Sequence, residues 1–291
     1  MTAATVAGRS SEDAERLERL QHLLLVVPAL AVIALVVVAP LAWMVVLSFL
    51  DEAGQFTLEN YRVFFTRGGY LGVIVTTFQV SLIVTLVTVL LGYPVTYLLV
   101  GLPRRLAMIA MLAIMLPYLT SILVRTFAWM VLLGRRGIVN SALETAGWID
   151  EPLPLLYNLT GTIIGMVHIM LPLLVLPLYG SMRSIDPNLM RAASNLGASP
   201  LAAFWRVYFR LSLPGVAAGA FLVFVSCLGF FITPALLGGG RVVMMAQQIA
   251  KAVAVGSHFG VASALGVGLL VATVAVLVVG RRLLRIDVAK P

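Results

Sequence analysis

The chain has 291 residues, of which 61% are hydrophobic and only 11% are charged, whereas a soluble domain carries about 25% charged residues. This balance excludes a fold around one water-facing core and predicts an all-α, polytopic membrane protein. The single cysteine, Cys227, excludes a disulfide framework and a cysteine metal site. The net charge of +8 reflects arginines at the ends of apolar runs and not a nucleic-acid surface, so no nucleic-acid partner is expected.

Apolar runs long enough to cross a bilayer predict six transmembrane helices, near residues 23–50, 70–102, 106–133, 155–182, 211–237 and 259–280. A lipid bilayer is therefore the first expected partner. The apolar residues after Arg125, Thr126 to Gly134, are too few to cross about 30 Å of hydrocarbon at about 1.5 Å per residue. We interpret them either as an outer extension of the third span or as a partly re-entrant piece.

Six spans place both termini on the same side of the membrane. The tails, residues 1–22 and 281–291, and the loops on their side hold 13 of the 20 Lys and Arg residues. The positive-inside rule then predicts that both termini and the loop at 183–210 are cytoplasmic. Residues 1–22 combine charged and apolar positions and predict a short amphipathic helix.

The cytoplasmic loop carries two consecutive helix signals. Asp186 followed by Pro187 predicts a capped helix start, and Gly197 predicts the end of that helix. Ser199 and Pro200 repeat the start signal. We therefore expect two short helices joined by a tight corner.

Each short helix has one apolar face, because apolar residues recur at i, i+3, i+4 and i+7. The two faces consist of Leu189, Ala192, Ala193 and Leu196, and of Leu201, Phe204, Trp205 and Tyr208. Pro214 is then expected at the entry to the fifth span. Two interpretations remain open: helices lying on lipid head groups, or a docking surface for a soluble partner.

At these residues the chain resembles the membrane-spanning permease subunits of binding-protein-dependent ABC importers. The resemblance follows the order and spacing of a cytoplasmic signature, carried here by Arg191, Ala192, Ala193, Gly197, Ala198, Ser199, Phe204 and Pro214. The usual first residue of that signature is Glu, so Arg191 reverses a charge. The strings LPYLTSILVRTFAWMVLLGRRGIVNSAL, at 116–143, and GFFITPALLGG, at 229–239, resemble the spermidine/putrescine-type subfamily.

The resemblance implies a type I ABC importer permease fold in the inner (plasma) membrane of a bacterium. It implies three partners: a cytoplasmic ATPase dimer, a second permease subunit that is a different chain, and a periplasmic or extracellular solute-binding protein. ATP and Mg would be bound by the ATPase, because this chain has no phosphate-binding GxxxxGK[ST] loop and needs no cofactor of its own. The loop helix from Asp186 to Gly197 would seat in a groove of the ATPase, and the chain itself would not be an enzyme.

The sequence indicates the class of the transported solute less directly than it indicates the fold. Our best interpretation is a polyamine such as spermidine or putrescine; an amino-acid-like or small carboxylate solute, or an ion-gradient-driven carrier, are alternatives. No acidic residue lies in any predicted span, so rings would have to guide a cation. The candidate path residues are Tyr118, Arg125, Phe127, Trp129, Tyr179, Phe230 and Phe231. The alternative interpretation of the rings among them is packing in the core or in interfacial belts.

Arginine and histidine residues are the remaining candidates for a functional role. Arg125 is expected near the outer boundary of the third span, either as an anchor to head groups or as part of a gating pair. His22, His168 and His258 lie in different segments without acidic or cysteine neighbours, so no metal site is expected.

Overall fold

The computed structural model describes residues 27–28, 30–66, 68–255 and 259–283. The predicted amphipathic helix within 1–22 and nearly all of the tail at 281–291 lie outside these residues. The described elements are the π-helical turns η1 (Ala34–Val38) and η2 (Phe204–Tyr208) and the α-helices α2 (Ala39–Leu47), α3 (Glu59–Thr66), α4 (Gly68–Gly101), α5 (Arg104–Leu119), α6 (Ile122–Leu133), α7 (Ile138–Thr145), α8 (Leu159–Arg183), α9 (Pro187–Asn195), α10 (Pro200–Ala203), α11 (Phe209–Leu228), α12 (Ile232–Leu237), α13 (Met245–Val255) and α14 (Phe259–Leu283).

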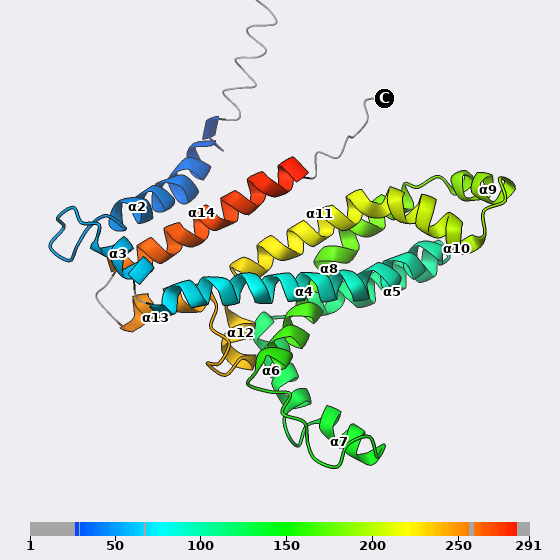
Figure 1. The fold of residues 1–291 in the computed structure, drawn as a ribbon, viewed down its shortest axis with the longest axis horizontal. Coiled ribbons are helices and arrows are strands. Elements are labelled where there is room, and N and C mark those ends of the chain that lie inside the picture. The colour runs from blue at the N-terminus through cyan, green and yellow to red at the C-terminus, as the bar shows by residue number, and fades with distance from the viewer. Residues whose placement is uncertain (1–26, 29, 67, 256–258, 284–291) are drawn as a thin grey trace, which may run out of the picture.

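The core of the molecule lies where α4, α8 and α11 pack against one another (Figure 1). Val84, Leu174 and Val223, one from each helix, are completely buried there. The backbones of α8 and α11 approach closely at Gly219, where a Cβ atom would lie 3.1 Å from the carbonyl oxygen of Leu174. These three helices therefore form the rigid part of the bundle on which the other elements are arranged.

A second group of helices consists of α2, α3, α13 and α14. Phe64, Met245 and Leu265 form its buried centre. The backbone N–H of Met245 donates to Thr77 Oγ1 on α4 at 2.9 Å, which joins this group to the core. In Figure 1, α2 and α14 lie side by side, as their contacts also require.

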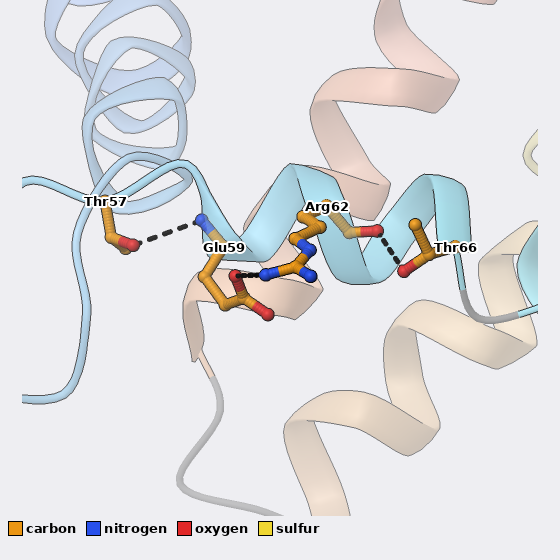
Figure 2. A network of polar contacts seen from close by, with 4 residues as sticks. All are labelled: Thr57, Glu59, Arg62 and Thr66. Atoms are coloured by element: carbon orange, nitrogen blue, oxygen red, sulfur yellow. Dashed lines mark hydrogen bonds and ion pairs between the residues drawn. The ribbon is translucent and has the colours of Figure 1, made fainter.

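The short helix α3 is held by local polar contacts (Figure 2). Thr57 Oγ1 accepts from the N–H of Glu59 at 3.1 Å, and Thr66 Oγ1 donates to the carbonyl of Arg62 at 2.7 Å. The exposed pair between Arg62 Nη1 and Glu59 Oε2, 3.5 Å apart, contributes little to stability because water screens it.

The prediction of an all-α, multi-span membrane fold is confirmed. Among the described residues, five helices are long and apolar enough to cross a bilayer: Leu30–Leu47, Gly69–Gly101, Leu159–Arg183, Pro200–Leu228 and Phe259–Gly280. A sixth candidate is a broken one, in which Arg104–Leu119 and Ile122–Thr145 meet at an angle of 98°.

Of the two interpretations of the residues after Arg125, the break contradicts a straight extension of the third span to 133 and agrees with a partly re-entrant piece. The backbone of Thr120 is extended, with φ −80° and ψ 158°, so α5 ends there and α6 starts in a new direction. Figure 1 shows α6 and α7 leading away from the direction of α4. Apolar composition indicates where a chain avoids water, but it does not record a change of direction.

The predicted fifth span at 211–237 is also wrong at both ends. A continuous helical stretch begins at Pro200, passes through η2 and ends at Leu228, so Pro214 lies inside a helix and not at its entry. A separate short helix, α12, follows. Pro234 is the third residue of α12, where its missing N–H costs little, whereas in the interior of a longer helix it would break a hydrogen bond.

Candidate functional site

The short helix α9 lies at one end of the three-helix core, opposite the end that carries α3 and α13 (Figure 1). Its start is capped as the sequence predicted: Asp186 Oδ1 accepts from the N–H of Asn188 at 2.9 Å, and Pro187 occupies the first helical position. Pro187 fits because that position needs no hydrogen-bonded N–H. The orientation of the helix is therefore fixed at its first turn.

The end of α9 is a Schellman motif. Gly197 has a φ of +84°, its N–H donates to the carbonyl of Ser194, and the N–H of Ala198 donates to the carbonyl of Ala193, both at 3.0 Å. Ser199 then caps the next helix, since its Oγ accepts from the N–H of Ala202 at 3.3 Å. The predicted corner between two helices is confirmed, but the second helix continues into α11 and is not a separate short piece.

The apolar faces predicted for this region point largely away from the chain. α9 packs mainly on α10 and η2, and Leu196 is 88% exposed and Leu201 is 68% exposed. Leu189 and Trp205 are exposed as well. Arg191 Nη1 donates only to the neighbouring Asn188 Oδ1, at 3.4 Å. An exposed cluster of large apolar side chains at the end of a bundle is typical of an interaction surface.

Behind α9 lies an aromatic cluster that the sequence analysis did not predict. Tyr97 of α4 lies edge-on to Phe204 and Tyr208, with ring centroids 5.4 and 5.2 Å apart. Tyr93 of α4 packs against Phe209 at 5.5 Å. The signal that could have found it is the i, i+4 spacing of the two tyrosines, which places both rings on one face of α4.

At the bend between α5 and α6, Arg125 caps the end of α5. Its Nη2 donates to the carbonyls of Tyr118 at 3.2 Å and Thr120 at 2.9 Å, and its guanidinium lies 5.7 Å from the Tyr118 ring centroid. A cation at a helix C-terminus also complements the helix dipole. Arg125 therefore stabilises the break between α5 and α6, a role that the sequence did not indicate for it.

Two side-chain hydrogen bonds attach α6 to its neighbours. Trp129 Nε1 donates to His168 Nδ1 of α8 at 3.2 Å, which leaves the His168 proton on Nε2. Thr126 Oγ1 and Thr233 Oγ1 of α12 are 3.2 Å apart. The structure thus places three predicted path residues, Tyr118, Arg125 and Trp129, on either side of one bend. It adds His168, whose pairing with Trp129 no sequence signal indicated.

The other predicted path residues are more dispersed. Phe127 and Phe231 are exposed, whereas Phe230 packs against the core cluster. Tyr179 lies 11 residues beyond His168 on α8, about 16 Å along the helix axis at about 1.5 Å per residue. The structure therefore does not bring Tyr179 to the bend.

Comparison with known proteins identifies the family. Residues 89–286 match the family described as binding-protein-dependent transport system inner membrane component. This chain belongs to that family. It is a multi-pass inner membrane protein and a permease subunit of an ABC importer, as its sequence resemblance predicted.

Curated relatives and a solved structure agree with this assignment. The chain is 31% identical over 241 residues to the spermidine/putrescine transport system permease protein PotB of Haemophilus influenzae, covering 81% of this chain and 84% of the relative. It is 34% identical over 194 residues to PotB of Escherichia coli, covering 67% and 70%. A bacterial alginate ABC transporter, solved in complex with an alginate pentasaccharide-bound periplasmic protein, has a chain of the same fold, with a TM-score of 0.74 at 16% identity over 94% of this chain and 96% of that one.

Proposed function

We propose that this permease imports a polyamine and is driven through α9 by a separate cytoplasmic ATPase dimer, which binds ATP and Mg. The observation that carries the coupling role is the geometry of α9: a helix capped at both ends that turns Leu189 and Leu196 away from its own chain. A groove on a soluble partner can bind a rigid helix with exposed apolar side chains, and a movement of that partner would then displace the helix. The residues that position it are Asp186, Pro187, Arg191, Ala192, Ala193, Gly197, Ala198, Ser199, Phe204 and Pro214.

The names of the curated relatives support the polyamine. A polyamine passing this chain would meet exposed rings at the bend and near α12, including Tyr118, Phe127 and Phe231. Rings attract cations by about 0.5–2 kcal/mol each, so they can guide a weakly bound amine. The carboxylates that a dication requires would come from a second, different permease subunit. Arg125 opposes a polyamine less than its charge suggests, because two helix carbonyls accept its hydrogen bonds.

The remaining partners follow from the same proposal. A solute-binding protein outside the membrane delivers the polyamine, and both termini and α9 face the cytoplasm. The distribution of Lys and Arg supports this orientation, with 13 of 20 on the side of the termini.

The test is uptake by the importer complex purified from cells and reconstituted into proteoliposomes. Labelled spermidine or putrescine should accumulate only with ATP and the binding protein, and amino acids or small carboxylates should not compete. Uptake driven by an ion gradient without ATP would overturn the proposal, and competition by carboxylates alone would overturn the polyamine.

A variant of α9 tests the coupling surface directly. Leu196→Asp should abolish co-purification of the ATPase, because it places a charge in an apolar contact. Leu58→Asp is the matched control: Leu58 is 60% exposed and lies next to α3, at the opposite end of the bundle. Equal ATPase recovery with both variants would contradict a docking role for α9.

A further inference from the structure

The aromatic cluster behind α9 has a role beyond packing, and that role rests on the proposed function of α9. Apart from its chain connections, α9 reaches the rest of the molecule mainly through α10 and η2. A displacement imposed on α9 by a partner must therefore enter the bundle largely through these two elements. α10 is a single turn that continues into η2. The contacts of η2 therefore determine which other helices a displacement of α9 would move.

The contacts of η2 lead to α4. We call the rings of Tyr93, Tyr97, Phe204, Tyr208 and Phe209 the aromatic clasp. Tyr97 lies edge-on to Phe204 and Tyr208, and Tyr93 contacts Phe204 at 6.3 Å and Phe209 at 5.5 Å. Edge-to-face ring pairs of this kind contribute about 0.5–1.5 kcal/mol each beyond the area that they bury. The clasp therefore joins the entry of α11 to the last turns of α4.

A partly buried hydrogen bond joins Tyr93 of the clasp to α11. Tyr93 Oη and Ser212 Oγ are 3.0 Å apart, and Ser212 is completely buried. Ser212 Oγ also donates its one proton to the carbonyl of Phe209, at 2.9 Å. The Tyr93 hydroxyl must then be the donor to Ser212, so this interhelical bond has a defined direction.

Two features indicate that the clasp can change its packing. First, η2 is a π-helical turn, in which the N–H of Phe209 bonds to the carbonyl of Phe204, five residues back. Such turns occur often at functional sites in helices. Second, the Tyr208 hydroxyl is buried without a hydrogen-bond partner among the described residues. Tyr208 borders a cavity of about 490 Å³ whose lining includes Met182 of α8 and Met190 of α9.

We propose that the aromatic clasp transmits the movement of α9 to α4 and α11, with Tyr97 and Tyr93 as positioning residues for transport. In the present arrangement the Tyr208 hydroxyl is unsatisfied, which costs free energy. In the other state of the transport cycle η2 repacks into the adjacent cavity and that hydroxyl gains a partner. Because η2 supplies two rings of the clasp, the clasp has a different packing in each state, and α9 and the solute path bias this one two-state element.

The experiment compares solute transported per ATP hydrolysed in reconstituted complexes that retain the ATPase. Tyr97→Leu removes two edge contacts and should lower this ratio at least fivefold, whereas Tyr97→Phe keeps the ring and should stay within twofold. Phe78→Leu is the matched control, because Phe78 of α4 also contacts a ring of α11, Phe224, at 6.0 Å, but away from α9. It should leave the ratio unchanged even where thermal stability falls.

Tyr93→Phe removes only the hydroxyl bonded to Ser212, and should lower the ratio by about twofold to fivefold in a complex that assembles normally. Ratios for Tyr97→Leu and Tyr93→Phe that match Phe78→Leu would overturn the clasp as a transmission element. Such a result would leave the proposed function intact if the wild-type complex still required ATP. Uptake by the wild-type chain without ATP would instead overturn the proposed function itself.

Discussion

Gly197 has a backbone conformation that a side chain would strain. Its φ is +84°, yet a Cβ atom there would meet no atom within 4 Å. Gly197→Ala should therefore cost about 1 kcal/mol through the backbone alone. This loss of stability is local to the corner that ends α9. The rate of amide hydrogen exchange in α9 should therefore increase about fivefold.

Gly180→Ala provides the control for this measurement. Gly180 also has open space around its Cβ position, but it lies inside α8 with an ordinary helical backbone. Exchange in α9 should not change in that variant. Equal exchange rates in the two variants would show that the left-handed conformation of Gly197 does not hold the corner.

Arg125 stabilises the bend between α5 and α6. A substitution can distinguish this structural role from direct contact with the solute. Arg125→Met removes both hydrogen bonds to the carbonyls of Tyr118 and Thr120 at the end of α5, and should lower the free energy of unfolding by about 2 kcal/mol. Arg125→Lys keeps one charged donor and should lose less. Thermal unfolding in detergent measures the loss, and the KM for solute should change less than twofold.

A large change in KM with unchanged thermal stability in Arg125→Met would instead place Arg125 in the solute path. The same distinction applies to its neighbour Trp129, whose Nε1 is already hydrogen-bonded to His168. The sequence could identify Trp129 as an aromatic residue near the boundary of a span. It could not supply His168, because the partner is 39 positions away and only the packing of α6 on α8 brings the two together.

At the scale of helices, the sequence predicted elements whose signals are local. The start of α9 at Asp186 and its end at Gly197 depend on residues within one turn, and both are found where the sequence places them. The sequence left the 98° bend after α5 as one of two alternatives and did not place it, and it missed the break before α12. Both lie inside continuous apolar sequence, and the bend is stabilised by a side chain, Arg125, that reaches back to α5 only once the chain has turned.

The close approach of α8 and α11 predicts the effect of a larger side chain at their crossing. A Cβ at Gly219 would lie 2.8 Å from Leu174 Cδ1 and 3.1 Å from the Leu174 carbonyl oxygen. Gly219→Val should therefore force the two helices apart and cost about 1–3 kcal/mol. The thermal midpoint of the purified protein measures this loss.

Gly72→Val separates that packing effect from the cost of a β-branched residue in a helix. Gly72 lies in α4, and nothing surrounds its Cβ position within 4 Å. Its thermal midpoint should stay near that of the wild type. A midpoint lowered equally in both variants would mean that the contact of α8 with α11 does not explain the loss.

For the whole molecule, the arrangement of helices makes a prediction about sides of the membrane. α9 and the ends of α4 and α8 gather at one end of the bundle, whereas α6 leads to α7 in another direction (Figure 1). If α9 faces the cytoplasm, as the distribution of Lys and Arg predicts, then α7 should be reachable from outside the cell. The chain suits a test by cysteine labelling, because its single cysteine, Cys227, is completely buried.

Leu196→Cys and Ser141→Cys place a thiol at an exposed position of the α9 corner and of α7, respectively. A membrane-impermeant maleimide should modify Ser141→Cys in intact spheroplasts, but Leu196→Cys only after lysis, and should not modify the wild type in either case. Bound ATPase should then slow the labelling of Leu196→Cys in lysed membranes without affecting Ser141→Cys, because only α9 is covered. Labelling of Leu196→Cys in intact spheroplasts would place α9 outside the cell, where no ATPase can drive it.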